Sequence, residues 1–488
     1  MFTIPSILDR AATLFPDAHV TDGDRPTTYP TLRENAARLA GTLADDGVDA
    51  GDTVAIADWN TPRFLELLYA VTGRGAIAYP VNLNLPGEQI GYTLEASETD
   101  RLLYADDFAP IADAFPGETG HVDDLDYGAA TPLAVEEDRD AVTLFTSGTT
   151  GRPKPVRYTH ERFVHGGLSI AHQLAEYDTP ATLSGEDTIF PGIPMFHLLS
   201  WGSAIIAPYL GANLSLGGQF DPAALGAAVE AGEATWTNLV PTMVRHLLAT
   251  EADVAGLKVL TGGSAIDRDL AETMADSEVA FSSIYGGTDM LAAAISIETD
   301  HAREASIDYL RRVVHPVPFG EFRLEHREGM DEEMGELHFR APWLPDGYYG
   351  MPERSAEAFL DGWFATGDVG RRMPDGGIRI LDRLGDTIKS GGEWIPPSVV
   401  ESAIVEFPGV ASAAVFARPD EEWGERPVAA ITPDDVDVDA LRDHLASVAE
   451  AGEIASWWIP DAFYLREELP LTSTGKMQKT QLREELLE

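Results

Sequence analysis

Short apolar runs alternate with segments of helical periodicity along most of this chain. Residues 53–58 and 76–81 predict strands, and residues 62–71 and 86–96, which follow them, predict helices. A repeated strand–helix order is typical of parallel sheets covered by helices on both faces. Ligands of such sheets bind beyond the carboxyl ends of the strands, so we expect the chemistry in the loops that follow the strands.

The same alternation returns in the middle of the chain. Helical patterns begin near residues 221 and 241. They are flanked by strand-like runs at residues 212–216, 235–240, 257–261 and 279–284. This second series predicts another sheet of the same kind, so the fold class that the pattern favours is α/β.

The pattern changes near residue 348 to short segments rich in glycine and aspartate. Beyond the sequence LDRLGD, about 100 residues contain mixed strands and helices, at 410–418, 428–432, 438–449 and 462–466. That length is enough for a small α+β domain of its own. We therefore expect an N-terminal domain at residues 1–382, a hinge at 383–386 and a C-terminal domain at 387–488.

The charge of the chain is unusual, because 81 acidic residues face 34 basic ones and the formal net charge is −47. The acidic residues are spread along the whole chain. Such self-repulsion destabilises a compact fold at low salt, and it is screened when the Debye length shrinks to about 3 Å at 1 M salt. We interpret the chain as a cytoplasmic protein of a halophile that accumulates salt; the alternative is an acidic protein of an ordinary cytosol. Either way, binding to the nucleic-acid backbone is disfavoured.

Composition excludes several other classes of protein. The chain has no cysteine, which rules out disulfides, thiolate zinc sites, iron–sulfur clusters and cysteine nucleophiles. No apolar run reaches about 18 residues, so we expect no integral membrane segment. The N-terminus lacks a basic stretch ahead of an apolar one, so we expect no secretory signal. The remaining expectation is a soluble intracellular protein whose oligomeric state is open, with a homodimer as one possibility.

The strongest local signal is the sequence TLFTSGTTGRPK, in which an apolar strand at 141–145 leads into a run of small residues: Thr146, Ser147, Gly148, Thr149, Thr150 and Gly151. Their hydroxyls and backbone N–H groups can wrap a polyphosphate, and Lys154 adds a positive charge. This lysine is one of only five in the chain. An ordinary turn is the alternative, which the density of hydroxyls and glycines beside a lysine disfavours. No GK[ST] follows, so the loop is not that of a common P-loop kinase or ATPase.

Two later strand ends carry further candidate residues. Gly263 and Ser264 follow the predicted strand at 257–261, where small residues allow a flat base to approach the backbone; a tight turn is the alternative. Thr288 and Asp289 follow the strand at 279–284. A carboxylate beside a triphosphate indicates Mg²⁺ between them.

The phosphate-binding sequence resembles that of the adenylate-forming superfamily, which includes acyl- and aryl-CoA synthetases, peptide-synthetase adenylation domains and beetle luciferases. Further superfamily motifs follow in order: YGGTDM at 285–290, TGDVG at 366–370, LDRLGDTIKSGGEWIPPSVVE at 381–401 and PLTSTGKMQK at 470–479. The resemblance implies a large N-terminal domain of two αβ-layered lobes plus a small β-barrel-like part. It also implies a small, mobile α+β C-terminal domain.

The resemblance also implies roles for individual residues of the ATP site. The adenine would be framed by Tyr285, Gly286, Gly263 and Ser264. Thr288 would lie beside them in the ATP site. Asp289 stands where the superfamily has a glutamate and would bind Mg²⁺ together with the hydroxyl of Thr146. The shorter aspartate could reach the ion through a bridging water.

Other ATP contacts would come from the later motifs. Asp368 matches the aspartate that accepts hydrogen bonds from both ribose hydroxyls, and Arg383 matches an arginine that contacts the same nucleotide from the hinge. Gly385 occupies the pivot. Lys476 resembles the mobile catalytic lysine that bridges the carboxylate and the α-phosphate; a solvated lysine is the alternative.

The implied reaction has two steps and uses an acid, ATP with Mg²⁺, and CoA. The acid and ATP give an acyl-adenylate and pyrophosphate, and a thiol then displaces AMP. Rotation of the C-terminal domain would withdraw Lys476 and bring a second strand to the site: Lys389, Gly391, Gly392, Glu393 and Trp394. Glycines in that strand would let a pantetheine arm pass close to the backbone.

The choice of acid is indicated by the sequence PMFHLLSW, which resembles a segment of medium- and long-chain fatty-acyl-CoA synthetases. In that subgroup a tryptophan matching Trp201 gates an acyl tunnel, and His197 would lie at its mouth beside the acyl carbonyl. A core aromatic is the alternative for Trp201. No basic residue occurs between Arg162 and Arg245, which favours a neutral acyl tail.

The leading hypothesis is therefore an AMP-forming fatty-acyl-CoA synthetase. The same chemistry on an aryl, branched or short-chain acid stays open. A third possibility, a nucleotide-binding homologue without ligase activity, is supported only by Asp289 and by Pro155, which stands where relatives usually have glycine.

Overall fold

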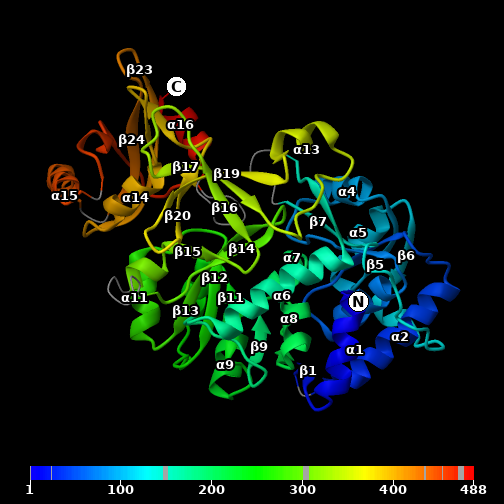
Figure 1. Cartoon of the computed structure of the whole chain (residues 1–488). Coiled ribbons are helices and arrows are strands. Elements are labelled where there is room, and N and C mark those ends of the chain that lie inside the picture. Colours follow the sequence, from blue (N-terminus) through cyan, green and yellow to red (C-terminus); the bar gives the residue numbers. More distant parts are fainter. Residues whose placement is uncertain are drawn as a thin grey trace. The chain divides into compact units, whose positions relative to one another are not determined.

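The computed structural model describes residues 2–23, 25–146, 152–299, 307–433, 436–452, 454–470 and 478–487. The chain forms two compact units (Figure 1). The first unit comprises Met1–Ile266, Leu270–Glu321 and Arg340–Phe364, and the second comprises Asp267–Asp269, Phe322–Phe339 and Ala365–Glu488. The expected hinge at 383–386 lies within the last of these segments, and its movement stays a prediction.

The first sheet of the first unit is parallel except at one edge. Its strands lie in the order β6 (Glu118–His121), β5 (Thr99–Tyr104), β3 (Thr53–Ala57), β4 (Ile77–Pro80), β7 (Asp140–Phe145) and β8 (Pro155–Thr159). Only the β7–β8 pair among these is antiparallel. The predicted strands at 53–58, 76–81 and 141–145 are thereby confirmed.

The second sheet of this unit contains the other predicted strand series. Its order is β15 (Val313–Pro316), β14 (Leu291–Ile295), β13 (Ala280–Gly287), β12 (Lys258–Gly262), β11 (Trp236–Leu239), β9 (Thr188–Pro191), β10 (Asn213–Ser215), β1 (His19–Asp22) and β2 (Arg25–Thr28). Strands β9 to β13 run parallel. The N-terminal strand β1 joins them by pairing with β10, a contact between distant parts of the sequence that periodicity did not predict.

Helices cover both sheets of the first unit. They are α1 (Ile4–Leu14), α2 (Tyr29–Asp45), α3 (Pro62–Gly73), α4 (Gly87–Ala96), α5 (Ala109–Ala114), α6 (His160–Glu176), α7 (Leu198–Trp201), α8 (Ser203–Leu210), α9 (Pro222–Glu230), α10 (Pro241–Leu248), α11 (Arg268–Asp276) and α13 (Pro352–Ala358). Short 3₁₀ turns lie at Asp106–Phe108 and Val122–Asp124. Helix α6 packs against β7, β8 and β14, so it touches both sheets and links the two lobes.

Local sequence explains where these helices begin. Thr61 caps α3 by accepting a hydrogen bond from the backbone N–H of Phe64, and Pro62 occupies the first turn. Proline is favoured there because its missing N–H would have no partner within the helix. The apolar stripes then pack into separate cores, one in the first lobe around Tyr79, Leu102 and Phe145 and one in the second lobe around other side chains: Leu239, Val259, Leu270 and Phe281.

The second unit contains two groups of strands. The first is β16 (Glu321–Glu325), β17 (Met334–Arg340), β19 (Trp363–Arg372) and β20 (Ile378–Arg383). The short strand β18 (Phe359–Leu360), which pairs with the first residues of β19, belongs to the first unit.

The second group forms the α+β domain expected near the C-terminus. Its strand order is β22 (Glu393–Ile395), β21 (Ile388–Ser390), β24 (Gly424–Pro433) and β23 (Val410–Asp420), and β25 (Phe463–Leu465) pairs with β24. The helices are α14 (Pro397–Val405), α15 (Val438–Glu450) and α16 (Lys479–Leu487), with a 3₁₀ turn at Ser456–Trp458. The predicted mixture of strands and helices is confirmed. No helix in the described part of the chain is long and apolar enough to span a membrane.

Candidate active site

The base of the predicted phosphate loop is closed by two backbone-mediated contacts. The N–H of Thr146 donates to the carbonyl of Lys154 at 3.0 Å, and the N–H of Lys154 donates to Oγ1 of Thr146 at 3.1 Å. Strands β7 and β8 therefore hold the two ends of the loop side by side. The other predicted loop residues lie outside the described residues: Ser147, Gly148, Thr149, Thr150 and Gly151.

The ammonium group of Lys154 is oriented by a tyrosine that the sequence analysis did not single out. Nζ donates to the hydroxyl of Tyr348 at 2.8 Å and lies 4.1 Å from the centroid of its ring. Tyr348 is itself buried. These contacts aim the lysine, because a cation over an aromatic face is held both by the ring quadrupole and by the hydroxyl.

Asp289 lies just beyond β13 and has a carboxylate oxygen without a partner. Its Oδ1 is buried and accepts no hydrogen bond from the residues that the structure describes. Tyr348 lies beside this carboxylate. Burial and the charge of Asp289 raise the pKa of Tyr348 well above its ordinary value. A buried oxygen without a donor is costly unless a ligand satisfies it.

A hydrogen bond joins the Asp289 loop to the phosphate loop. Oγ1 of Thr288 donates to the carbonyl of Phe145 at 3.2 Å, and these residues directly precede Asp289 and Thr146. The hydroxyl of Tyr158 in turn donates to the carbonyl of Thr288 at 2.6 Å. The two predicted Mg²⁺ ligands therefore lie on adjoining strand ends.

The donor set fits Mg²⁺ bound together with ATP. Among the described residues there is no group of three or more side chains of His, Cys, Asp or Glu that could hold a metal by themselves. Mg²⁺ usually takes one or two carboxylates and completes its shell with substrate phosphates and water. Asp289, with its unsatisfied oxygen, and the hydroxyl of Thr146 would be the protein's contribution.

The predicted adenine edge lies at the carboxyl ends of two neighbouring parallel strands. Gly263, just after β12, has φ +83° and is exposed, as is Ser264. Tyr285 and Gly286 lie in β13, at a bulge in its pairing with β14. A Cβ on Gly262 would meet the carbonyl oxygen of Ile284 at 2.3 Å, so glycine is needed for the close approach of β12 and β13.

Asp368 and Arg383 face each other across β19 and β20 in the second unit. The guanidinium Nε lies 2.9 Å from Oδ1 of Asp368, whose backbone N–H donates to Oγ1 of Thr366 at 3.0 Å. The structure thus brings the predicted ribose aspartate and the hinge arginine into one ion pair. The Asp368 side chain is buried, whereas that of Arg383 is largely exposed, so the arginine is the partner that is free to turn to a nucleotide.

Of the predicted acyl residues, His197 directly precedes α7 and Trp201 is the last residue of α7. Both are partly buried. Burial lowers the pKa of His197 to about 4, so the imidazole is neutral near pH 7. The turn between them has left-handed backbone angles, which the hydrophobic pattern did not reveal.

The predicted CoA strand is a β-hairpin in the second unit. Gly391 and Gly392 have φ +59° and +90° and form the two-residue turn between β21 and β22. Such turns require positive φ, so the turn alone explains both glycines without a passage for pantetheine. Opposite each other across the hairpin, Nζ of Lys389 lies 5.4 Å from the ring centroid of Trp394. Glu393 is exposed.

Lys476 lies outside the described residues, but the lysine that follows it at 479 is well defined. Nζ of Lys479 is 2.8 Å from Oε1 of Glu401, and both side chains are largely buried. Burial opposes the charge of Lys479, but Glu401 and Asp382 raise its pKa above the ordinary value. The sequence analysis did not single out Lys479.

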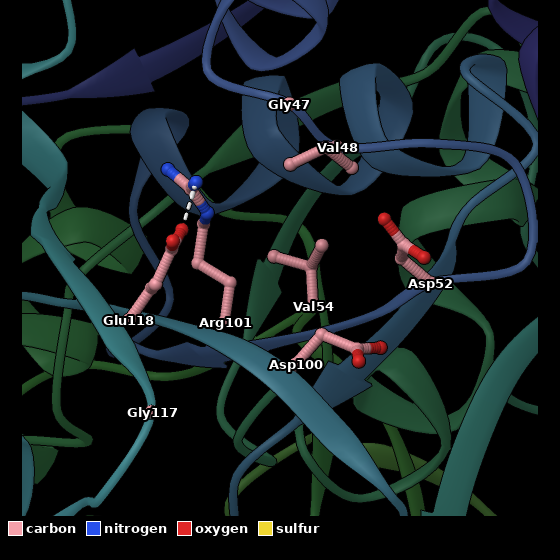
Figure 2. A pocket seen from close by; sticks show the side chains of 8 residues that line it. All are labelled: Gly47, Val48, Asp52, Val54, Asp100, Arg101, Gly117 and Glu118. Atoms are coloured by element: carbon pink, nitrogen blue, oxygen red, sulfur yellow. Dashed lines mark hydrogen bonds and ion pairs between the residues drawn. The ribbon is translucent and has the colours of Figure 1, made fainter.

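A pocket in the first lobe lies at the amino ends of the strands of the first sheet (Figure 2). Its volume is ≈ 300 Å³, and its lining comes from the starts of β3, β5 and β6: Gly47, Val48, Asp52, Val54, Asp100, Arg101, Gly117 and Glu118. Arg101 is paired there with Glu118. Ligands bind at the carboxyl ends of such strands, so this pocket is not the active site.

Comparison with known proteins identifies the family. Residues 8–349 match the AMP-binding enzyme family, and residues 399–476 match the AMP-binding enzyme C-terminal domain. The chain therefore belongs to the AMP-binding enzyme family.

Individual relatives agree with this assignment over nearly the whole chain. A long-chain-fatty-acid–CoA ligase of Thermus thermophilus is 34% identical over 98% of this chain and 94% of its own. A feruloyl-CoA synthase of an Amycolatopsis species is 32% identical over 97% of each chain. Among solved structures, the o-succinylbenzoate coenzyme A synthetase of Bacillus subtilis in complex with ATP and a magnesium ion is 26% identical, with a TM-score of 0.83 and coverage of 98% and 99%.

These findings confirm the predicted fold and the predicted class of enzyme. The chain is an acid–thiol ligase of the AMP-forming type, and its cosubstrates are ATP with Mg²⁺ and CoA. The roles of individual site residues stay predictions.

Proposed function

We propose that this protein is an AMP-forming acyl-CoA synthetase whose acid is a medium- or long-chain fatty acid. The observation that carries its adenylation site is the buried Oδ1 of Asp289, which has no partner among the described residues. The hydrogen bond between Thr288 and Phe145 ties this carboxylate to the strand that leads into the phosphate loop. A carboxylate oxygen without a donor at that point supports a cation that accompanies ATP.

In the first half-reaction a carboxylate oxygen of the acid attacks the α-phosphorus of ATP. The bond from that phosphorus to the bridging oxygen breaks, and pyrophosphate leaves with the electron pair. Mg²⁺, when bound, would neutralise charge on the phosphates. Lys154, aimed by Tyr348, would add a fixed positive charge, and Lys476 would bridge the attacking carboxylate and the α-phosphate.

In the second half-reaction the sulfur of CoA attacks the acyl carbonyl carbon. The bond from that carbon to the phosphate oxygen breaks, AMP leaves, and the thiol proton passes to solvent. We infer that the hairpin residues serve this step after the C-terminal domain has rotated: Lys389, Gly391, Gly392, Glu393 and Trp394. Asp368 and Arg383 would hold the nucleotide through both steps.

The fatty-acid assignment is supported by the segment around α8. Its sequence, SAIIAPYL, is apolar, and residues 203–208 are buried. No basic residue occurs between Arg162 and Arg245, so this stretch offers no anchor for a second carboxylate. His197 is neutral at physiological pH, so it can form a hydrogen bond with the acyl carbonyl without placing a charge beside an apolar tail.

An aryl acid is the second candidate. The observation that favours it is the feruloyl-CoA synthase of Amycolatopsis, which is almost as similar to this chain as the long-chain ligase of Thermus. A flat aryl group would need a shorter and wider pocket than an alkyl chain. The boundary of that pocket would again be set by Trp201.

The test is a screen for CoA-dependent AMP release over straight-chain acids from acetate to stearate, with benzoate and ferulate alongside, in molar KCl. We expect the highest kcat/KM for acids of medium or long chain. A preference for ferulate would instead support the aryl candidate. ATP binding without AMP release for any acid would contradict both.

We also propose that the protein comes from a halophile and works in the cytoplasm. The net charge of −47 supports the first statement, because such a chain is stable only where salt screens its self-repulsion. The need for ATP and CoA supports the second, since both are intracellular substrates.

A further inference from the structure

The acyl segment contains an unusual stretch of backbone. Leu198, Leu199, Ser200 and Trp201 have φ between +50° and +56°, and Gly202 follows at +87°. The N–H of Trp201 donates to the carbonyl of His197 at 3.0 Å. These residues therefore form one turn of left-handed helix in which only the last position is glycine.

Left-handed backbone is unfavourable for residues with a Cβ, because the Cβ crowds the following carbonyl oxygen. One such residue is common in folded proteins, whereas four in succession persist only where the surroundings hold them. The side chain that holds this turn is therefore of interest.

Asn238 holds the segment that contains the turn through hydrogen bonds to Ile193, Ser200 and Ser203. Its Nδ2 donates to the carbonyl of Ser200 at 2.7 Å and to Oγ of Ser203 at 3.1 Å. Its Oδ1 accepts from the N–H of Ile193 at 3.1 Å and from Oγ of Ser200 at 3.3 Å. Both donors and both acceptor positions of the amide are thus occupied by this one segment.

The location of Asn238 is unexpected for an amide. It lies in β11, between parallel neighbours, and is fully buried. Central parallel strands are normally apolar on both faces. A buried amide whose hydrogen bonds all go to the segment 193–203, with Ser200 of the left-handed turn at its centre, indicates a positioning role.

The turn connects the acyl residues to the ATP site. Helix α7 packs against β14, which begins two residues after Asp289. His197 precedes the turn and Trp201 ends it. Any change in the handedness of the turn must therefore reorient both side chains.

We propose that Asn238 is a positioning residue for acid selection. It keeps residues 198–201 left-handed and so fixes the orientation of Trp201, which sets the chain length that the enzyme accepts. This inference rests on the proposed function of Trp201 as the boundary of the acyl pocket.

A matched control is available in the same segment. Asn60 is also a buried asparagine, and it holds the residues before the turn. Its Nδ2 donates to the carbonyls of Pro191 and Ile193 at 2.8 and 3.0 Å, and its Oδ1 accepts from the N–H of Met195 at 2.8 Å. None of these three hydrogen bonds involves a left-handed residue.

The experiment compares Asn238→Ala, Asn60→Ala, and each of them combined with Ser200→Gly. A glycine at position 200 adopts positive φ without strain, so it removes the need for the clamp. We expect Asn238→Ala to change the ratio of kcat/KM for long and short acids by roughly tenfold, the lower end of what one methylene is worth in an apolar pocket, with the KM for ATP nearly unchanged. Adding Ser200→Gly should restore the ratio for Asn238→Ala and should not repair Asn60→Ala.

Hydrogen exchange of the peptide that spans 193–203 gives a second readout. Faster exchange in Asn238→Ala, slowed again by Ser200→Gly, would support the clamp. Unchanged exchange, or faster exchange with an unchanged acid ratio, would overturn the proposal. The acid profile of the unsubstituted enzyme is measured first: if aryl acids are preferred, the fatty-acid assignment fails, and the same variants are then compared on aryl acids of different length.

Discussion

At the scale of single residues, the carboxylate of Asp289 is the proposed protein ligand of Mg²⁺. We expect Asp289→Asn to raise the Mg²⁺ concentration needed for half-maximal activity and to slow adenylation by about 100-fold, the usual scale for one preorganised electrostatic group. The melting temperature should stay within a few degrees, because Oδ1 accepts no hydrogen bond from the described residues that the substitution would remove. The measurement is pyrophosphate release against Mg²⁺ concentration.

Asp346→Asn is the control for that experiment. Asp346 lies in the same unit and pairs with Arg162 at 2.7 Å, but its side chain is 90% exposed. Its removal should leave the Mg²⁺ titration unchanged. An Asp289→Asn enzyme with the same Mg²⁺ titration as Asp346→Asn would remove Asp289 from the metal site.

His197 should make stability depend on acidity. Burial lowers its pKa to about 4, whereas in the unfolded chain it is near 6.5. Between these values the unfolded state binds more protons, so the free energy of unfolding falls as the pH is lowered from about 6.5 towards 4. Substitution by glutamine, which does not titrate, should make that fall shallower. Equal slopes for the wild type and His197→Gln in denaturant titrations from pH 7 to pH 5 would contradict this account.

At the scale of secondary-structure elements, the pairing of Lys479 with Glu401 joins α16 to α14 in the second unit. Lys479→Met would leave Glu401 buried without its cation, and such a loss typically costs about 3–5 kcal/mol. Replacing both residues by apolar ones, Lys479→Met with Glu401→Leu, should recover most of that loss. Chemical denaturation of both variants is the measurement, and a double variant no more stable than the single one would show that packing matters here rather than charge.

Helices and strands were predictable where the period of the apolar positions was the dominant signal. The strands and helices from residue 53 to residue 96 follow the pattern, as do those of the C-terminal domain. The pairing of β1 with β10 was not predictable, since it joins segments far apart in the sequence. The handedness of the turn at 198–201 was not predictable either, because the apolar pattern carries no information about the sign of φ.

The site was predictable to a similar extent. Motifs at strand ends indicated Thr146, Lys154 and Asp289, because phosphate chemistry needs small residues and charges at such ends. Tyr348 was missed, since it reaches Lys154 from a loop almost two hundred residues later. Asn238 was missed because the role of an amide in an apolar strand depends on its hydrogen-bond partners, which the sequence does not show.

At the scale of the whole molecule, the excess of acidic residues limits how many carboxylates can pair with a basic side chain. With 81 acidic and 34 basic residues, most carboxylates cannot have a basic partner. Screening by salt is then the main relief from repulsion. We expect the melting temperature to rise steeply with KCl concentration, measured by calorimetry from dilute buffer to molar salt. Full stability and activity in dilute buffer would contradict the halophilic origin.

The division into two units suggests a division of labour between the half-reactions. The first unit contains the phosphate loop and Asp289, while Lys476 and the hairpin with Gly391 belong to the second. On the proposed mechanism, Lys476 would be needed only while the carboxylate meets the α-phosphate. An acyl-adenylate that is already formed has lost pyrophosphate and needs no such bridge.

The most direct test of this account is to measure the two half-reactions separately in Lys476→Ala. We predict that acyl-adenylate formation falls by about 100- to 1000-fold, the scale for one preorganised charge. Conversion of synthetic acyl-adenylate and CoA to acyl-CoA should stay near the wild-type rate, with a wild-type melting curve. An equal loss in both half-reactions by a folded enzyme would contradict the account.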